Sequence, residues 1–250
     1  MLDRSRGEPV QSLPPSVARL LRTSCRYGVG VCRRTLRFAA CLKHHRLFAY
    51  SIAYHTYVLK VVNRQFVGLN LGSGGSKIKG FCNIDANPFA LSDVVARIDR
   101  LKLRANSVGI IYNSHIFEHV PGGQAGRVLA EWYRVLKPDG RLYICVPDLE
   151  VLFKVYLDNI TLYHTEEGRY LVDLTCGVTY GGQTSKYDYH FSGYSFVTLK
   201  DILESVGFKN VQRFDRSALG FAQFVDASYA RFEKGKLAGL SISLNVVASK

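Results

Sequence analysis

The sequence predicts an α/β fold built on a mainly parallel sheet, and two observations support this. From residue 66 onward, short apolar runs alternate with segments of helical periodicity, a pattern typical of parallel strands joined by helices. A glycine-rich turn follows the first of these runs, where a parallel sheet binds ligands beyond the carboxyl ends of its strands. The chain has 250 residues, 47% of them hydrophobic, which suits a sizeable core. We therefore expect seven strands, with helices covering both faces of the sheet.

Seven apolar runs are the expected strands. They comprise residues 66–72, 80–86, 93–99, 108–115, 141–148, 210–215 and 241–250. The link from Gly74 to Phe81 is too short for a crossover helix, because such a connection needs about a dozen residues. We expect one irregular turn there instead.

Two helices are placed by their periodicity and by the residues at their ends. The first covers 122–140, with Pro138 and Gly140 expected to stop it. The second covers 198–208, with Thr198 as its N-cap and Gly207 closing it. The apolar residues that share one face of the first helix are Val128, Leu129, Trp132, Val135 and Leu136.

Basic charge is concentrated at the start of the chain. Residues 1–65 hold 12 Lys and Arg against two acidic residues, a net charge of +10, whereas the remainder holds 21 against 18. We therefore expect a basic helical extension over 1–65 and a globular domain over 66–250.

The extension has three candidate partners. An anionic membrane surface is preferred, because basic groups next to an apolar, aromatic run favour binding at a lipid interface. The same acid-poor composition also suits an organelle transit peptide. Nucleic acid ranks third, because aromatic residues are not interleaved with the arginine cluster in the way that a stacking platform needs. We expect a cytoplasmic protein, peripheral to the membrane, with organelle import left open.

The cysteines indicate a reducing compartment. Six are present and none forms a C-x-x-C pair. Cys82 and Cys145 lie within expected strands and are predicted to be buried free thiols. Cysteines and histidines near the N-terminus have no standard zinc-ligand spacing, so we predict no metal site. No uncharged apolar run reaches the roughly 18 to 20 residues that span a bilayer.

The glycine-rich turn indicates a nucleoside site. Glycines let the backbone approach a ligand closely, and Asp85 ends the next expected strand, where a carboxylate accepts hydrogen bonds from a ribose. A Walker loop is excluded because no G-K-[ST] follows. A dinucleotide fingerprint fits poorly, because its third glycine falls at Lys77 and Asp85 follows Gly72 by only 13 residues, against about 20.

From residue 69 onward the chain contains, in this order, LNLGSGG, NIDAN, ARIDRLKL, IIYNSHIFEHV and LAEWYRVLKPDGRLYICVPD. These blocks resemble the motifs of class I S-adenosylmethionine (SAM)-dependent methyltransferases, in particular a group found among surface-polysaccharide genes. LNLGSGG resembles the first motif, NIDAN the acidic end of the second strand, and ARIDRLKL the third-strand motif. IIYNSHIFEHV resembles the fourth-strand motif, and LAEWYRVLKPDGRLYICVPD the helix and strand after it. The closing block is GGQTSKYDYHFSGYSFVTLKDILESVGF. The resemblance covers residues 66–250 and implies a Rossmann-like sheet with an antiparallel last strand.

The resemblance also implies SAM as the cofactor and a set of residues that bind it. The glycines of the first motif should face the methionine part of SAM, the second-strand acid its ribose, the third-strand segment its adenine, and the end of the fourth strand its methyl group. These residues are Gly72, Ser73, Gly74, Asp85, Asp99, Arg100, Leu101 and Ser114. The chain departs from the family pattern at Asn70, where an acidic residue is common, at Ser76, where the last glycine is common, and at Gly109. We expect Asn70 to weaken the electrostatics of cofactor binding.

Methyl transfer to a hydroxyl benefits from a general base, and two histidines are our candidates. His190 lies in a polar, tyrosine-rich loop that a core does not need, and His115 follows the fourth strand. Glu118 and His119 belong to the generic motif and are interpreted as architectural. Asp148 is either a base or a helix cap.

The function that the sequence predicts is therefore SAM-dependent methylation of a hydroxyl on a small molecule or on a glycan- or lipid-linked sugar, in polysaccharide biosynthesis. Two alternatives are an RNA or protein methyltransferase that grips its substrate with the basic extension, and a nicotinamide-dependent oxidoreductase. The oxidoreductase is disfavoured by the poor fingerprint and by the lack of a Y-x-x-x-K pair. A cofactor-binding protein without catalysis is the remaining alternative.

Overall fold

The structure is a computed structural model that describes residues 66–185, 187–219 and 224–250. The expected basic extension, residues 1–65, lies outside the described residues. Its predicted helices and partners therefore stay predictions.

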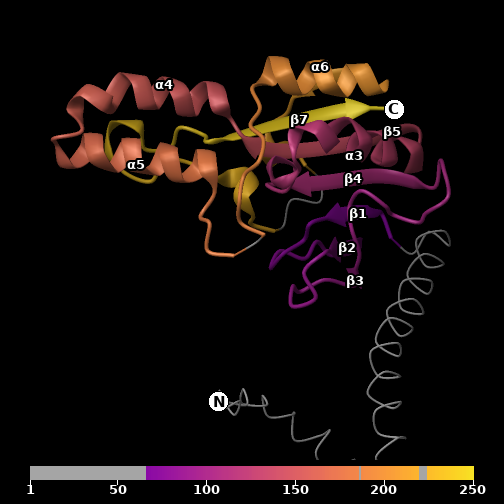
Figure 1. Cartoon of the computed structure of the whole chain (residues 1–250). Helices are drawn as coiled ribbons and strands as arrows, with labels where there is room; N and C mark the ends of the chain where they lie inside the picture. Colours follow the sequence, from indigo (N-terminus) through magenta and orange to yellow (C-terminus); the bar gives the residue numbers. More distant parts are fainter. Residues whose placement is uncertain (1–65, 186, 220–223) are drawn as a thin grey trace, which may run out of the picture. The chain divides into compact units, whose positions relative to one another are not determined.

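The described residues form one seven-stranded sheet in the order β3-β2-β1-β4-β5-β7-β6. All pairs from β3 across to β5 are parallel, whereas β7 runs antiparallel to both β5 and β6. Figure 1 shows this as the β4 and β7 arrows pointing in opposite directions. The predicted mainly parallel sheet with an antiparallel last strand is confirmed. The strands are β1 (Gly68–Leu71), β2 (Phe81–Asp85), β3 (Val94–Val95), β4 (Val108–Ser114), β5 (Leu136–Pro147), β6 (Lys209–Arg213) and β7 (Ser243–Ser249).

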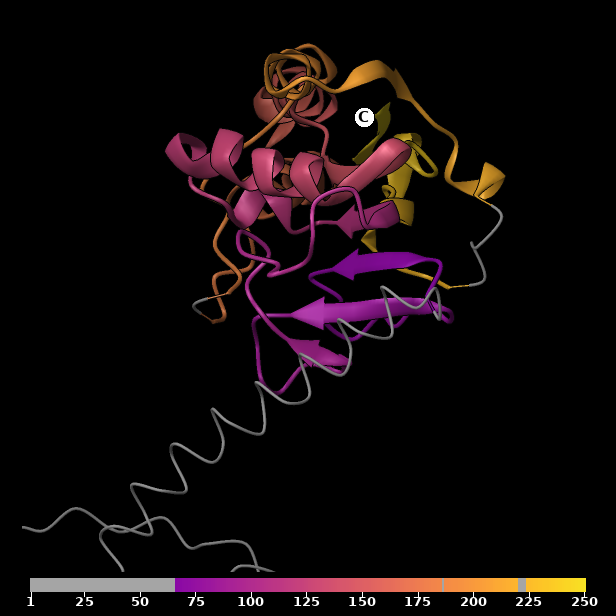
Figure 2. The same ribbon diagram turned by 90° about the vertical axis from the view of Figure 1, so that its right-hand side faces the viewer.

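Four α-helices accompany the sheet in the described residues: α3 (Gly122–Val135), α4 (Leu149–Asn159), α5 (Glu166–Tyr180) and α6 (Phe196–Val206). Helices α3 and α6 lie together over one face of the sheet, as the views of Figures 1 and 2 agree. Their buried residues join the largest core cluster. Five short 3-10 helices complete the set: η1 (Phe117–His119), η2 (Ile160–Leu162), η3 (Arg216–Ala218), η4 (Ala227–Tyr229) and η5 (Gly235–Leu237).

The alternation along each strand divides the core between the two faces of the sheet. In β4, Ile111 points into the cluster under α3 and α6, whereas the next residue, Tyr112, belongs to a second cluster on the opposite face. In β5, Ile144 and Cys145 divide in the same way. Both faces of the central strands are therefore buried, which explains why these strands read as continuous apolar runs.

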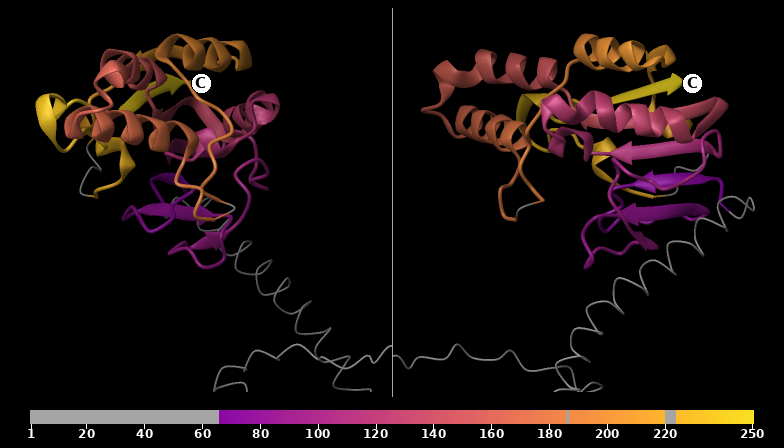
Figure 3. Two further views of the ribbon diagram at one scale, coloured as in Figure 1. Left: turned by 60° about the vertical axis from the view of Figure 1, so that its left-hand side comes forward. Right: turned by 45° about the vertical axis from the view of Figure 1, so that its right-hand side comes forward.

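Helices α4 and α5 were not predicted from the sequence. They lie side by side beyond the sheet, as Figures 1 and 3 both show. Leu152 of α4 and Leu171 of α5 meet in a third core cluster, which Phe232 and Ile242 complete. The chain that follows α5 returns to the carboxyl ends of the parallel strands, so this helix pair carries a loop to the edge where ligands bind.

Three predicted boundaries need correction. Helix α3 ends at Val135, before the expected stop at Pro138 and Gly140, because Leu136 already pairs with Val108 of β4. The third strand is reduced to two residues. Thr198 is not the N-cap of α6: Ser195 is, and the Thr198 hydroxyl completes a capping box by accepting the backbone N–H of Ser195.

Other expectations are confirmed. No helix joins β1 to β2, and the link consists of turns, as its length predicts. Gly207 closes α6 with φ +114. Cys82 and Cys145 are buried free thiols, and burial raises the pKa of Cys82 to about 12. Within the described residues, no helix combines the length and apolarity needed to span a membrane.

Candidate functional site

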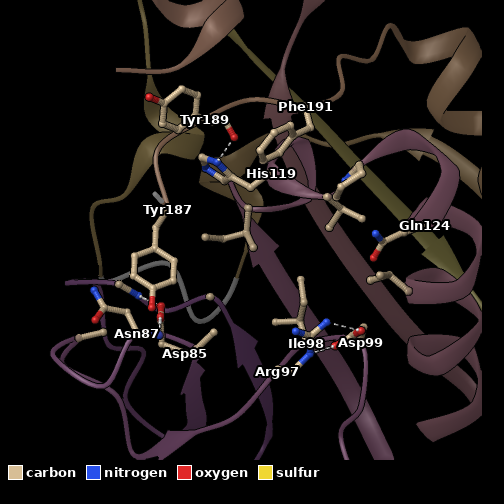
Figure 4. Close-up of a pocket in the computed structure, with 18 residues that line it drawn as sticks. Asp85, Asn87, Arg97, Ile98, Asp99, His119, Gln124, Tyr187, Tyr189 and Phe191 are labelled. Carbon is tan, nitrogen blue, oxygen red and sulfur yellow. Dashed lines mark hydrogen bonds and ion pairs between the residues drawn. The ribbon is translucent and has the colours of Figure 1, made fainter. Parts of the chain in front are cut away.

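A cavity of about 410 Å³ opens at the carboxyl ends of β1, β2 and β4. Its floor comes from the β1–β2 turn and from the residues that follow β2 and β3. Its walls come from η1, from the start of α3 and from the loop after α5. Figure 4 shows Asp85 and Asp99 at the floor, Gln124 at one side, and His119 and Phe191 at the other end. This is the edge of a parallel sheet where ligands bind.

The Asp85 carboxylate organises the floor of the cavity. Its Oδ2 accepts the backbone N–H of Gly74 at 2.8 Å, and its Oδ1 accepts the N–H of Asn87 at 2.7 Å. Asp85 is buried, and it lines the cavity. Each carboxylate oxygen has about two acceptor sites, so both retain capacity for a ligand hydroxyl.

The two glycines of the first motif are needed for different reasons. Gly72 has φ +72, and a Cβ there would lie 2.2 Å from Cγ1 of Ile116. Gly74 has φ +50, and its Cβ would meet nothing within 4 Å. Gly72 therefore permits close packing beneath the turn, whereas Gly74 leaves open the space above it. Both line the cavity.

Asn70 supports the turn from below and does not line the cavity. Its buried Nδ2 donates to the Ser76 carbonyl and to Asn83 Oδ1, both at 2.9 Å. A carboxylate at this position has no proton to donate to either acceptor. An amide at position 70, in place of the acidic residue common in the family, therefore supplies the donor that the oxygen of its partner Asn83 needs.

Asp99 lines the cavity, and two arginines donate hydrogen bonds to its carboxylate. Arg97 donates to both carboxylate oxygens at 2.8 Å, and Arg127 of α3 donates to Oδ2 at 3.2 Å. The hydrogen bonds from Arg97 hold the pKa of Asp99 below its usual range. Arg97 lines the cavity as well, so a ligand here meets a paired, ionised carboxylate.

The remaining predicted cofactor residues do not line the cavity. Ser73 and Leu101 are buried, and the Leu101 N–H donates to Glu131 of α3. Arg100 is exposed. Ser114 ends β4, and its hydroxyl is buried. The structure thus brings together Gly72, Gly74, Asp85 and Asp99 of the predicted set.

The loop after α5 forms an aromatic wall. Tyr187, Tyr189 and Phe191 line the cavity, and they are 44%, 41% and 60% exposed. The Tyr189 and Phe191 rings stack with centroids 6.4 Å apart. Backbone N–H groups of Phe191 and Ser192 donate to the Glu118 carbonyl, which anchors the loop on η1.

A buried carboxylate with three histidines around it lies behind this wall. The Glu118 side chain is 1% exposed, with Oε1 3.4 Å from His115 Nδ1 and 3.9 Å from His190 Nε2. The His119 and His190 rings meet edge to face with centroids 4.8 Å apart. Burial lowers the pKa of His190. We call Glu118, His115, His119 and His190 the histidine cluster.

Only one member of the histidine cluster lines the cavity, and it is not one of the two predicted catalytic residues. His119 faces the cavity, and its Nδ1 donates to the Tyr189 carbonyl at 2.9 Å. His190 and His115 point toward Glu118 and lie outside the cavity lining. Asp148 is buried away from the cavity, where it caps α4 and accepts Arg213 at 3.0 Å, so its role as a helix cap is the one the structure supports.

Comparison with known proteins identifies the family. A family model for a methyltransferase domain matches residues 31–144, beginning within the predicted extension and ending in β5. The chain contains a class I SAM-dependent methyltransferase domain. No curated protein matches this methyltransferase in sequence.

Several solved structures are similar to the methyltransferase at low identity. One SAM-dependent methyltransferase, from Archaeoglobus fulgidus, has 15% identity and a TM-score of 0.45 over 82% of this chain and 94% of its own. Another, from Thermotoga maritima, has 15% identity and a TM-score of 0.41, covering 86% and 97%. A third, from Methanosarcina mazei, has 17% identity and a TM-score of 0.44, covering 73% and 91%. These similarities are too distant to indicate an acceptor.

SAM is the cofactor of the methyltransferase, and the residues at the cavity fit it. The Gly74 position leaves open space above the turn. Near the carboxyl ends of β1 and β4, three buried polar atoms have no hydrogen-bond partner within the described part of the chain: Ser73 Oγ, Asn113 Oδ1 and Ser114 Oγ. Their residues do not line the cavity, so the fit depends on the open space above Gly74 and on the Asp85 carboxylate, whose oxygens retain capacity for a ligand hydroxyl.

Proposed function

We propose that the methyltransferase transfers the SAM methyl group to a hydroxyl oxygen of a sugar, carried by a small molecule or a lipid-linked glycan. The observation that supports this is the aromatic wall, whose exposed rings line the same cavity as Asp85 and Asp99. Cofactor and acceptor would then share one cavity, with Asp85 and Asp99 at the cofactor end and the wall at the acceptor end.

The aromatic wall suits a sugar better than a charged acceptor. Large exposed apolar side chains grouped at a concave site mark binding surfaces. The flat faces of Tyr189 and Phe191 offer apolar area to the C–H face of a sugar ring, and the tyrosine hydroxyls offer hydrogen bonds to its edge. No acidic group of the wall itself lines the cavity within the described residues.

The chemistry favours an oxygen acceptor. The sulfonium methyl is already activated, so positioning the acceptor in line with it supplies most of the effect, up to roughly 7 to 11 kcal/mol. β4 ends at Ser114 and is followed by His115, not by the N-P-P-Y type of segment that serves amino acceptors. A hydroxyl loses its proton on methylation. We propose that this deprotonation takes place at the acceptor end of the cavity, next to the histidine cluster.

The test is to identify the methylated class of molecule. Full-length protein is incubated with methyl-labelled SAM and, separately, with a glycolipid extract, total RNA and a protein extract, with Asp85→Ala as the negative control. Label in a glycan as a base-stable methyl ether, reduced with Asp85→Ala at limiting SAM, supports the proposal. Label recovered only in RNA or protein contradicts it and favours an acceptor gripped by the basic extension.

The aromatic wall provides a second test on the identified acceptor. Tyr189→Ala should raise KM for the acceptor about 10-fold or more while leaving SAM affinity unchanged, because the ring contacts only the acceptor end. Tyr163→Ala is the matched control, since Tyr163 is similarly exposed and does not line the cavity.

A further inference from the structure

The Glu118 carboxylate is the most unusual polar group in the described residues. Its side chain is 1% exposed, yet neither Oε1 nor Oε2 accepts a hydrogen bond from the described part of the chain. Leaving a buried carboxylate unpaired costs several kcal/mol, so a cation or a proton has to compensate it. Imidazole nitrogens of His115 and His190 lie 3.4 and 3.9 Å from Oε1, so a protonated ring or an ion that these rings help to hold would compensate the charge.

The hydrogen bonds around His119 and His115 leave lone pairs for a cation. Because a carbonyl only accepts, His119 Nδ1 is the protonated nitrogen in its bond to Tyr189, and Nε2 keeps its lone pair when the ring is neutral. The Ser243 hydroxyl donates to Asn245 Oδ1, so His115 Nε2 donates to Ser243. In the neutral ring, His115 Nδ1 then has a free lone pair and lies 3.4 Å from Glu118 Oε1.

The spacing of these atoms matches a metal site. Ligand atoms of Glu118, His119 and His190 lie within 4.8 Å of one another. Around a four-coordinate Zn²⁺ with bonds of about 2.0 to 2.2 Å, neighbouring ligand atoms lie roughly 3.4 Å apart. The separations of 3.4 and 3.9 Å from Glu118 Oε1 to the His115 and His190 nitrogens are close to this value. The other pairs lie within 4.8 Å, so the most distant ligand atoms have to approach by up to about 1.4 Å when the ion binds.

The surroundings also resemble those of metal-bound histidines. A ligating histidine usually donates its other N–H to a carbonyl, a carboxylate or another polar group, which fixes its orientation. His119 does so to Tyr189, and His115 does so to Ser243. His115 holds φ +50, uncommon for a residue other than glycine, which supports a functional reason for its placement.

We propose that Glu118, His119 and His190, with His115 beside them, bind one divalent transition-metal ion of the Zn²⁺ type. Two histidines and one carboxylate are a common ligand set for such ions and leave a further coordination position open. His119 lines the cavity, so that position faces the acceptor end. In the proposed function, on which this last step rests, the acceptor hydroxyl oxygen binds the ion. Its pKa falls, its proton leaves to solvent, and the oxygen then forms its bond to the methyl carbon as the sulfonium sulfur departs with the electron pair.

The experiment measures metal binding directly on the full-length protein. The protein is stripped with a chelator, the chelator is removed, and Zn²⁺ is titrated by calorimetry, with Co²⁺ absorption spectra reporting coordination. Glu118→Gln and His190→Ala should each weaken binding at the site by about 100-fold or more and change the Co²⁺ spectrum. Zn²⁺ should raise Tm for the wild type but not for these variants. His164→Ala, an exposed histidine outside the cluster, should bind like the wild type.

Unchanged Zn²⁺ affinity and Co²⁺ spectra across all variants would overturn the proposal, as would the absence of any binding to the wild type. The comparison between variants excludes metal bound by cysteines or histidines elsewhere in the chain. If Glu118→Gln fails to fold, His190→Ala and His119→Ala decide the question. SAM affinity is measured on the same samples. A protein that binds SAM and methylates a glycan without metal contradicts the metal site alone, whereas metal binding without glycan methylation contradicts the proposed function alone.

Discussion

Asn70 and Asn83 form a side-chain pair beneath the glycine turn, with Asn70 Nδ2 donating to Asn83 Oδ1 at 2.9 Å. Asn83 Oδ1 also accepts the Ile78 N–H, and Asn83 Nδ2 donates to Asp93 Oδ2 at 2.7 Å. The cofactor-binding turn is therefore supported by a continuous network of buried and partly buried hydrogen bonds. Every donor in this network faces an acceptor, so positions 70 and 83 each need a side chain with an N–H donor, such as the asparagine amide.

Asn70→Asp should destabilise the methyltransferase, although it restores the acidic residue common in the family. The new carboxylate would face two acceptors, the Ser76 carbonyl and Asn83 Oδ1, in a buried position. We expect a loss of at least about 2 kcal/mol in the free energy of unfolding, with weaker SAM binding. Denaturant unfolding measures the first effect. Wild-type stability in the variant would show that the network tolerates a second carboxylate.

Asp93 should make stability depend on pH. Burial alone would raise the pKa of Asp93, but hydrogen bonds from Lys77 and Asn83 outweigh burial and lower it. A carboxyl group whose pKa is lower in the folded state stabilises the fold above its unfolded pKa, about 3.9. That stability is lost as the pH falls through the folded pKa. The free energy of unfolding should therefore fall more steeply on acidification in the wild type than in Asp93→Asn. Parallel curves for the two proteins would contradict this.

Substitution of the two glycines of the turn by alanine should have different effects on stability and on SAM binding. Gly72→Ala combines a left-handed backbone with a collision against Ile116, so we expect a loss of about 2 to 4 kcal/mol in stability. Gly74→Ala meets no atom and should lose only about 1 to 2 kcal/mol, but its methyl group enters the cavity and should weaken SAM binding. Gly75→Ala, with open space and no left-handed backbone, is the control. Equal effects of all three on SAM affinity would contradict the placement of the cofactor.

The basic extension should bind anionic membranes. Basic groups near an anionic surface contribute about 1 kcal/mol each, and residues 1–65 carry a net charge of +10. Full-length protein should sediment with anionic but not neutral vesicles, whereas a protein beginning at Asn63 should stay in the supernatant and still bind SAM. Identical sedimentation of both proteins would remove the membrane role.

The sequence predicted the strands well because their apolar runs are short and bounded by turns. It missed α4 because apolar side chains lie on several sides of that helix: Leu152 and Val155 are buried, but Phe153 and Leu157 are exposed. Because the apolar residues do not form a single stripe along one side of α4, the sequence lacks the helical periodicity on which the prediction depends. Glycines within α5 weaken its signal in the same way.

The site residues that belong to one short motif could be predicted from the sequence, whereas those brought together from distant segments could not. Gly72, Gly74 and Asp85 lie within 14 residues of each other, and the turn itself brings them together. The histidine cluster joins residues 115–119 to residue 190, and only the packing of the loop after α5 on η1 makes that contact. An acidic residue next to a histidine after β4, Glu118 and His119, could have indicated a functional site. Because both residues belong to the generic motif, the sequence alone favoured an architectural interpretation of them.

Asp85 is the residue on which the proposed cofactor site depends most directly, and calorimetry of SAM binding tests its role. Asp85→Ala removes a ligand acceptor and the anchor of the Gly74 N–H, so binding should weaken by about 1 to 3 kcal/mol, roughly 5- to 150-fold. Asp158→Ala is the matched control, because Asp158 is exposed on α4 and pairs only with Lys154 among the described residues. We predict weakened SAM binding in Asp85→Ala and wild-type SAM binding in Asp158→Ala. An unchanged SAM affinity in a folded Asp85→Ala protein would contradict this prediction.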